Sequence, residues 1–197
     1  MKLPSKYFQN EDVVFLAKDL IGKVLCSYIS GKFTSGIITE TEAYNGVVDK
    51  ACHAYGNRRT KRTETMYTSG GVTYVYLCYG IHHLFNVVTS VKNDPKAILI
   101  RGIQPLDGLS HILDRRGKTK LTPKIASGPG TMSQALGIKT AHNAMDLQSE
   151  SIWIEDRGIQ ILRENIQSTP RIGIDYAHED ILLPYRFVLN KGSIILD

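Results

Sequence analysis

The stretch GVTYVYLCYGIHHLFNVVTS, residues 71–90, contains two apolar runs that are separated by little more than Tyr79 and Gly80. Both runs are rich in β-branched and aromatic residues, which is the composition of β-strands. Glycine in such a position marks a turn. We therefore expect a protruding β-hairpin, or at least a sharp reversal of the chain, with Tyr79 near its tip.

Side chains along a strand point alternately to the two faces of the sheet, so the first run separates its residues into two sets. Tyr74, Tyr76 and Cys78 should share one face, whereas Leu77 and Tyr79 should lie on the other. Tyrosines on a strand usually pack against neighbouring side chains, but they also suit a pocket for a flat ring. Both interpretations remain open from the pattern alone.

The segments around this hairpin predict an α+β fold, in which helices flank a mixed, largely antiparallel sheet. AILIRG (97–102) is a short buried strand that should end at Arg101, placing its guanidinium at a sheet edge. Expected helices are a first one capped by Asn10 and ending at Gly22, one at 109–116, and two short ones within 121–139, with Thr131 capping the second. The other expected strands are 23–29, 35–44, 151–156, 159–164 and 185–190.

The composition is that of a globular protein with one domain covering residues 1–197. Hydrophobic residues make up 42% and charged residues 22%, and no repeat or low-complexity run interrupts the chain. No segment has the length or composition of a signal peptide or a transmembrane helix. Three widely spaced cysteines predict reduced thiols rather than disulfides or a zinc site. We expect a cytoplasmic protein, or a nuclear one in a eukaryote, with no membrane contact.

Basic residues are concentrated in the first three quarters of the chain. Residues 1–149 hold 19 basic and 11 acidic side chains, whereas residues 150–197 hold 5 and 8. The sequence NRRTKR (57–62), which we call the basic loop, places four cations within five positions: Arg58, Arg59, Lys61 and Arg62. Such a loop suits a phosphate backbone, although a solvated loop without a partner is the simpler alternative.

The sequence TETEAYNG (39–46) places Glu40, Glu42 and Tyr44 on one face of a predicted strand. A solvated face would explain this pattern, and so would a pocket in which a carboxylate acts as a base beside an aromatic wall. Arg101 has the same ambiguity, because it could form a structural salt bridge or hold a carboxylate or phosphate. His53 alone would be structural, and no histidine has the spacing of metal ligands.

In chain order, the motifs ETEAYNG…H, YVYLCYGIHHLFN, AILIRGIQPLDG, SGPGTMSQALGI and RIGI…LPYRFVL resemble the alkyladenine DNA glycosylase family, also called methylpurine or 3-methyladenine DNA glycosylases. The resemblance is collinear over nearly the whole chain. It implies a monofunctional enzyme that flips a damaged purine out of duplex DNA and hydrolyses its N-glycosidic bond, leaving an abasic site for base excision repair. Implied substrates are 3-methyladenine, 7-methylguanine, hypoxanthine and ethenoadenine. It also implies a monomer, nucleoid-associated in a bacterium, and no cofactor.

The resemblance assigns roles to individual residues. Glu42 would activate the attacking water, and Arg101 would hold that water and the carboxylate. Tyr79 would fill the gap left in the duplex. The base pocket would be formed by Tyr44, His53, Tyr76 and Asn86, with Asn86 excluding the 2-amino group of guanine.

Several alternatives remain at this point. Periodicity does not distinguish Glu40 from Glu42 as the base, because both share a face. A non-catalytic module that binds distorted DNA would use the same basic loop and tyrosines. A glycosylase with lyase activity would need an amine nucleophile, and the motifs contain no lysine. A small-molecule nucleosidase would leave the basic loop without a role.

Overall fold

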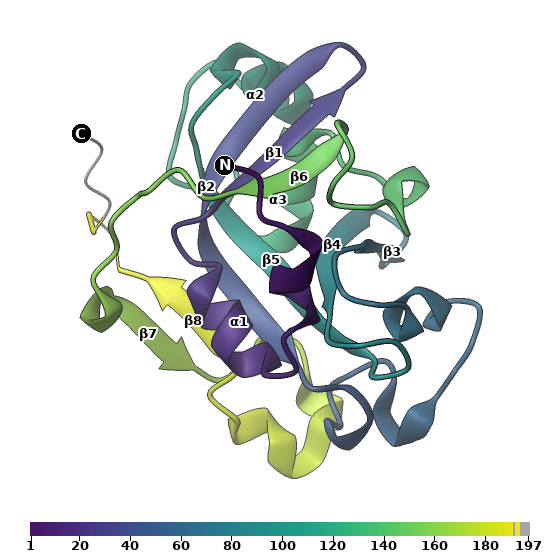
Figure 1. The fold of residues 1–197 in the computed structure, drawn as a ribbon. Coiled ribbons are helices and arrows are strands. Elements are labelled where there is room, and N and C mark those ends of the chain that lie inside the picture. Colours follow the sequence, from purple (N-terminus) through teal and green to yellow (C-terminus); the bar gives the residue numbers. More distant parts are fainter. Residues whose placement is uncertain (191, 194–197) are drawn as a thin grey trace.

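A computed structural model describes residues 1–190, 192 and 193. Within them the chain builds an eight-stranded sheet in which every pairing is antiparallel, as Figure 1 shows. The order is β3-β4-β5-β2-β1-β6, and β8 pairs with both β2 and β7. The strands are β1 Val24–Ile29, β2 Lys32–Tyr44, β3 Thr73–Cys78, β4 His82–Thr89, β5 Lys96–Pro105, β6 Ile152–Glu155, β7 Ile166–Thr169 and β8 Arg186–Leu189.

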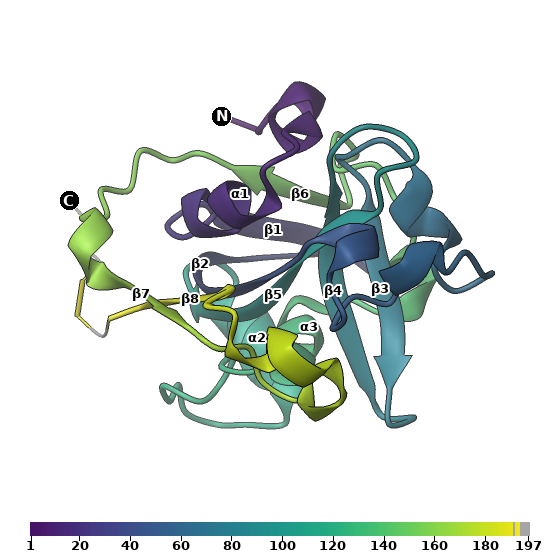
Figure 2. The ribbon, with the colours of Figure 1, turned by 90° about the horizontal axis from the view of Figure 1, so that it is seen from below.

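Helices cover both faces of the sheet. In Figure 2, α1 lies on one side and α2 and α3 lie on the other. Buried apolar residues of α1 and α3 join the sheet in the main core. The α-helices are α1 Val13–Asp19, α2 Leu109–Arg116 and α3 Pro129–Leu136. The 3₁₀ segments are η1 Ser5–Gln9, η2 Gly46–Val48, η3 Tyr55–Asn57, η4 Glu64–Tyr67, η5 Thr140–His142, η6 Arg163–Asn165 and η7 Asp175–Leu182.

The strands β3 and β4 form the expected hairpin. Their register pairs Cys78 with His82, and the N–H of Ile81 donates to the carbonyl of Cys78 at 3.2 Å. Tyr79 and Gly80 both have positive φ, 51° and 72°, as a type I′ turn requires. For a tyrosine this conformation costs about 1–2 kcal/mol. The turn therefore holds a strained, exposed aromatic side chain at the tip.

The strand β2 positions the charged residues that the sequence singled out. It pairs with β5 on one side and with β1 and then β8 on the other. Its pairing with β5 shifts register on both sides of Glu40, which marks a bulge. The carboxylates of Glu40 and Glu42 nevertheless converge on the same arginine, so the expected common face is confirmed.

Two expected element ends are wrong. The cap of α1 is Asp12, whose carboxylate accepts from the N–H of Phe15 at 2.8 Å, whereas Asn10 accepts from the N–H of Asp12. The strand β5 does not end at Arg101, because the residues after it continue to pair with β2 as far as Pro105. Arg101 therefore lies inside β5, two residues beyond the last pair of β5 with β4, and its carbonyl accepts from the N–H of Gly128 at 2.9 Å.

Two expected elements are also wrong. Only one helix forms within 121–139, because Gly128 is its N-cap and Pro129 its first residue. Thr131 lies inside that helix, and its hydroxyl donates back to the carbonyls of Ser127 and Gly128. Residues 159–164 form no strand, and the pairing with β8 begins at Ile166 instead. No helix among the described residues is long and apolar enough to cross a membrane.

Candidate active site

A carboxylate without any exposed surface lies behind one end of a pocket. Glu42 is 0% exposed, accepts two hydrogen bonds and forms one ion pair. The backbone N–H of Ile172 donates to Oε1 at 2.8 Å, and the hydroxyl of Tyr44 donates to Oε2 at 2.8 Å. Arg101 completes the set with Nη1 at 3.3 Å from Oε1. A carboxylate has about four acceptor positions, so the two hydrogen bonds leave room for a further donor such as water.

Glu40 has a different environment, although it shares the face of Glu42. Its Oε1 accepts from Nε of Arg101 at 2.8 Å and from Nε of Arg186 at 2.7 Å. Two guanidinium groups therefore neutralise this carboxylate. Arg101 bridges both glutamates, and it also lines the pocket. The side chain of Arg101 is therefore consistent with both interpretations, a structural salt bridge and a functional group at the pocket.

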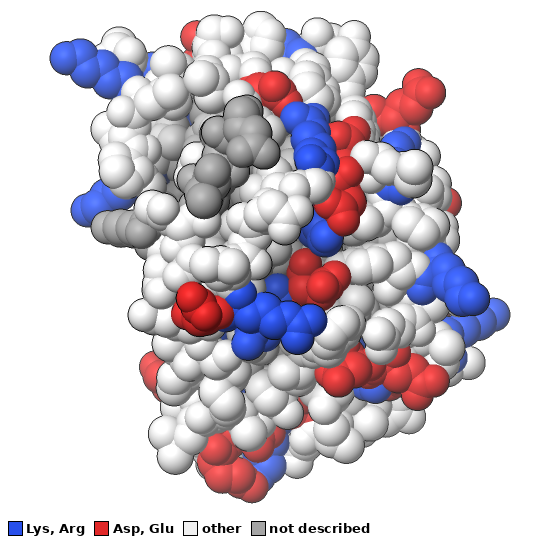
Figure 3. Space-filling model, turned by 60° about the vertical axis from the view of Figure 1, so that its left-hand side comes forward, with Lys and Arg blue, Asp and Glu red and all other residues white. Residues whose placement is uncertain are grey.

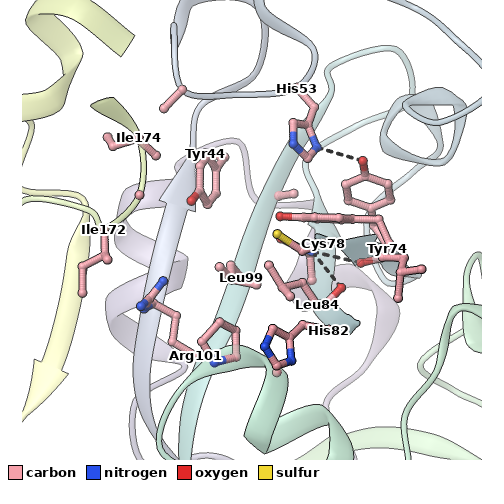
Figure 4. A pocket seen from close by; sticks show the side chains of 18 of the residues that line it. Tyr44, His53, Tyr74, Cys78, His82, Leu84, Leu99, Arg101, Ile172 and Ile174 are labelled. Atoms are coloured by element: carbon pink, nitrogen blue, oxygen red, sulfur yellow. Dashed lines mark hydrogen bonds between the residues drawn. The ribbon is translucent and has the colours of Figure 1, made fainter. Parts of the chain in front are cut away.

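The pocket has a volume of about 570 Å³ and is lined mainly by aromatic and apolar side chains. Figure 4 shows Tyr44 and His53 on either side of its upper part, with Arg101 and His82 at the lower end. Behind the walls, a small core of buried residues supports Tyr44 and Tyr76. The residues expected to form a base pocket all line this cavity: Tyr44, His53, Tyr76 and Asn86.

His53 is held in a neutral state and a fixed orientation. Burial, together with the nearby charges of Arg62 and Arg58, lowers the pKa of His53 to about 4. Its Nε2 lies 3.4 Å from Nη2 of Arg62, which can only donate, so Nδ1 carries the proton and pairs with the hydroxyl of Tyr74 at 2.9 Å. The imidazole therefore brings no positive charge into the pocket at neutral pH.

The tyrosines of the pocket are also uncharged. Burial, followed by the charge of Glu42, raises the pKa of Tyr44 well above its ordinary value. Burial likewise raises the pKa of Tyr76. The ring of His53 packs edge-on against Tyr76, with centroids 4.8 Å apart. These walls offer aromatic faces and hydroxyl groups, but no anion.

Asn86 lies on β4 at the back of the pocket and is 3% exposed. Its amide Nδ2 donates to the carbonyl of Tyr74 at 3.0 Å, and less closely to that of Leu84. The amide orientation is therefore fixed by the backbone of the hairpin. The alternation of side chains along β4 could not predict this contact, because the accepting carbonyl belongs to the neighbouring strand.

Tyr79 lies at the mouth of the pocket. It is 90% exposed at the tip of the β3–β4 hairpin, and it also lines the cavity. Two further apolar side chains near the tip are exposed as well, Leu77 and Ile81. An exposed aromatic side chain in a strained turn is retained at a cost in stability, which favours a functional role for it.

The four cations of the basic loop differ in their surroundings. Arg59 forms a bidentate pair with Glu64 and stacks on the ring of Tyr67. Arg62 lies over the ring of Tyr76, with Cζ 4.7 Å from the centroid, and lines the pocket. Arg58 and Lys61 are exposed, and their side chains make no hydrogen bond or ion pair within the described part of the chain. Two of the four cations are thus engaged within the protein.

The face that carries β7 and β8 provides a contrast with this loop. Figure 3 shows basic and acidic side chains next to one another on that face, without a patch of one sign. Pairs such as Arg186 with Glu40 account for part of this arrangement. A surface of alternating sign offers no continuous attraction to a polyanion.

Sequence reasoning missed a second buried ion pair close to Glu42. Arg171 pairs with Asp49, and the two side chains are 0% and 1% exposed. The motif RIGI contains Arg171, but its partner lies 122 positions earlier, so no local pattern indicates the pair. Tyr74 was also left undecided, and the structure places it in the pocket wall. Among the described residues, no group of three or more His, Cys, Asp or Glu side chains could hold a metal ion.

Comparison with known proteins gives a consistent result over almost the full chain. Residues 7–193 match the family model described as methylpurine-DNA glycosylase. A relative from Chlamydia felis is 50% identical over 189 residues, which is 95% of this chain and 96% of the relative. One from Chlamydia pneumoniae is 44% identical, with 95% of each chain covered, and one from Bacillus cereus strain G9842 is 42% identical over 196 residues, again with 95% of each covered. Each carries the name "Putative 3-methyladenine DNA glycosylase".

Proposed function

Because the chain belongs to the methylpurine-DNA glycosylase family, we propose that it flips alkylated or deaminated purines out of duplex DNA and hydrolyses their N-glycosidic bond. The product would be an abasic site, the starting point of base excision repair. The observation that carries the proposal is the buried carboxylate of Glu42, held by two hydrogen bonds and an ion pair at the end of an aromatic pocket. That combination suits a general base beside a site for a flat ring.

In the proposed reaction, Glu42 takes a proton from a water molecule, and the water oxygen attacks C1′ of the sugar. The bond between C1′ and the purine nitrogen breaks, and its electron pair leaves with the base. Positive charge develops on the sugar, so a carboxylate on the side opposite the leaving base stabilises the transition state. Arg101 lies 3.3 Å from Oε1 of Glu42 and lines the pocket, so it can hold both groups in place.

Recognition of the flipped base falls to the aromatic walls. Tyr44, His53 and Tyr76 would contact its faces and edges. A cationic alkylated purine is attracted by aromatic faces, and the neutral state of His53 avoids repelling it. Asn86 would narrow the back of the pocket against the 2-amino group of guanine. Substrates of this class are 3-methyladenine, 7-methylguanine, hypoxanthine and ethenoadenine.

Contact with the duplex would involve the hairpin tip and the basic loop. Tyr79 is exposed in a strained turn at the pocket mouth, where an inserted side chain would replace the stacking of the flipped base. Arg58 and Lys61 are free to bind phosphates, whereas Arg59 and Arg62 would first have to leave Glu64 and Tyr76. We propose that the protein acts as a monomer on nucleoid DNA in the cytoplasm and needs no cofactor.

The test uses a labelled duplex with one hypoxanthine or one ethenoadenine, incubated with excess protein in EDTA and then treated with or without alkali. Strand cleavage only after alkali, lost in Glu42→Gln, is expected for a monofunctional glycosylase. An active Glu42→Gln variant would overturn the assignment of the base. No release of these bases, nor of any base from alkylated genomic DNA, would favour a module that binds distorted DNA without catalysis.

A glycosylase with lyase activity is a second candidate, because a lysine amine can form a Schiff base with a carbonyl carbon such as that of an opened sugar. The described residues that line the pocket include no lysine, which favours the hydrolytic route. Borohydride added during turnover is expected to trap no covalent complex with damaged DNA. A trapped complex would require a nucleophilic amine elsewhere and would exclude the monofunctional mechanism.

A further inference from the structure

Arg171 is a buried cation that the proposed mechanism does not use, and it contacts the strand that carries Glu42. Its Nη1 and Nη2 donate to the two carboxylate oxygens of Asp49, at 2.5 and 2.8 Å. Nη1 also donates to the carbonyl of Ala43 at 2.8 Å. Ala43 is the residue of β2 between Glu42 and Tyr44. Arg171 is therefore attached directly to the backbone of the strand that carries the base.

Asp49 extends this attachment to the loop that follows β2. Its oxygens accept from the N–H groups of Asn45 at 2.8 Å and of Ala51 at 3.0 Å, in addition to the guanidinium. The loop leads to His53 in the pocket wall. One buried ion pair thus fixes the end of β2 and the start of the segment that supplies the opposite wall.

The guanidinium also supports the ring of Tyr44. Its Cζ lies 4.9 Å from the ring centroid of Tyr44 and 5.3 Å from that of Tyr185, so it contacts two tyrosine rings. A planar cation favours such contacts. The hydroxyl of Tyr44 is one of the two hydrogen-bond donors to Glu42. Arg171 consequently restricts the ring that carries this donor.

A second donor to Glu42 follows Arg171 directly in the chain. The N–H of Ile172 donates to Oε1 of Glu42 at 2.8 Å, although Ile172 itself is 50% exposed and lies in a loop. A loop residue with an exposed side chain has little packing of its own to hold its peptide group. Instead, the buried guanidinium of Arg171 restrains this peptide bond from its N-terminal side.

We infer that Arg171 is a positioning residue, which holds the two hydrogen-bond donors to Glu42, the hydroxyl of Tyr44 and the N–H of Ile172, and so fixes the orientation of the general base. The inference rests on the proposed function, because it assigns Arg171 a role only if Glu42 activates water. Asp49 neutralises the guanidinium, so the pair acts through geometry rather than by adding net charge beside Glu42. Misplacement of a reacting group by about 1 Å costs on the order of 100-fold in rate.

A hydrogen bond that Arg171 lacks is consistent with this role. The Nε atom of Arg171 is buried and has no hydrogen-bond partner among the described residues. A buried donor without a partner lowers stability. The pair is therefore not optimised for stability alone, and replacing both charges by neutral groups can leave a buried site folded.

The experiment compares single-turnover base release and DNA affinity in three variants. The double variant Arg171→Met/Asp49→Asn removes both charges, while the amide oxygen that replaces one carboxylate oxygen would still accept from a backbone N–H. Arg171→Lys keeps the charge but loses the bidentate geometry. Arg115→Met is the matched control, because Arg115 donates to the backbone carbonyls of Ile29 and Ala135 far along the sheet from Glu42 and does not line the pocket.

We expect the rate constant of base release to fall about 10- to 100-fold in the double variant and less in Arg171→Lys. Affinity for a duplex with one hypoxanthine should stay within about threefold of the wild type, and Arg115→Met should keep the wild-type rate constant. A merely structural pair would lower the thermal stability of the variants and leave the rate constant of base release unchanged.

An unchanged rate constant in both Arg171 variants would overturn the inference, and so would an equal loss in Arg115→Met. If the wild type releases the base and the Arg171 variants do so with the same rate constant, the proposed function stands and only the positioning role is excluded. Failure of the wild type to release any base would instead overturn the proposed function, and the inference with it.

Discussion

Two groups of charged side chains in this molecule differ in burial, in pairing and in how far apart their members lie in the sequence. The buried charge cluster contains Glu40, Glu42, Asp49, Arg101, Arg171 and Arg186, which come from β2, β5, β8 and two loops. The basic loop, residues 57–62, takes all its cations from one short segment, and those side chains are exposed. The cluster is neutral as a whole, whereas the loop carries four positive charges.

This difference separates a site where the positions of the side chains matter, the buried cluster, from one where charge alone matters, the basic loop. Breaking one partner out of a buried, hydrogen-bonded pair costs about 3–5 kcal/mol, whereas an exposed pair contributes about 0–1 kcal/mol. Hydrolysis at C1′ needs side chains in fixed positions, and the cluster supplies them. Attraction of a phosphate backbone needs only exposed cations, and the loop supplies those. Variants of the cluster and of the loop test whether the two groups separate in this way.

The largest effect is expected for Glu42→Gln. The substitution keeps the shape of the side chain but removes the base, so single-turnover release of hypoxanthine should fall at least about 1,000-fold, within the range for general bases. Affinity for the same duplex, measured by fluorescence anisotropy, should be retained. Loss of affinity in parallel with the rate would mean that the cluster contributes to DNA binding and would break the comparison.

Glu40→Gln is the matched control within the cluster. Glu40 accepts from Arg101 and Arg186 and lies beside the base, but it receives no hydrogen bond from Tyr44 or Ile172. We expect this variant to lose thermal stability, because two buried guanidinium groups lose their shared anion, and to keep most of its rate constant. A rate as low as that of Glu42→Gln would leave the identity of the base undecided.

This pair of glutamates also indicates how far the sequence predicts the site. Alternation along a strand correctly placed Glu40 and Glu42 on one face. It could not separate them, because two of the contacts that distinguish them, with Arg186 and with the N–H of Ile172, come from residues 146 and 130 positions away. Arg171 was missed for the same reason. Pairing across such separations is a property of the fold and not of any local pattern.

The second prediction concerns His53, where the basic loop meets the pocket. Its folded pKa of about 4 lies below the ordinary value of 6.5, so the unfolded state binds the proton more readily. Stability should therefore be complete above pH 6.5, fall as the pH drops from 6.5 to 4, and change no further below 4. At about 1.4 kcal/mol per pKa unit, the total loss is up to about 3 kcal/mol.

Urea unfolding of wild type and His53→Gln at several values between pH 7 and pH 4 measures this contribution. The difference in unfolding free energy between the two proteins should change with pH across that interval. His111→Gln is the control, because His111 lies on α2 outside the pocket. A His53→Gln variant that retains the full pH dependence would mean that burial beside Arg62 and Arg58 does not disfavour the charged imidazole.

The third prediction concerns Tyr79, which is part of neither charged group. Removing its ring should weaken binding to a damaged duplex about 10- to 100-fold, because stacking on a base contributes about 1–3 kcal/mol. Thermal stability should not fall, since the side chain is 90% exposed. Tyr79→Ala and Tyr79→Phe, compared by anisotropy and thermal unfolding, test this. Phenylalanine keeps a stacking ring, so a loss of affinity in Tyr79→Phe equal to that in Tyr79→Ala would argue against insertion.

The hairpin that carries Tyr79 was predictable because its determinants are local: two β-rich runs and a Tyr-Gly turn. The helix at 109–116 was equally predictable for the same reason. The end of β5 was not, since the strand continues past Arg101 only because β2 is long enough to pair with it. Residues 159–164 have a strand-like composition, but they find no partner strand in the described fold.

The smallest effect at a fixed salt concentration is expected for the two free cations of the basic loop, in the double variant Arg58→Ser/Lys61→Ser. Each phosphate contact adds about 0.9 to the slope of log affinity against log salt, so the slope should decrease by about 1.8. The rate constant of base release should not change. Arg59→Ser is the control, because Glu64 already neutralises Arg59, and its slope should change less. Equal slopes in wild type and double variant would mean that these cations touch no phosphate, and a reduced rate constant would mean that the loop, like the cluster, acts through geometry.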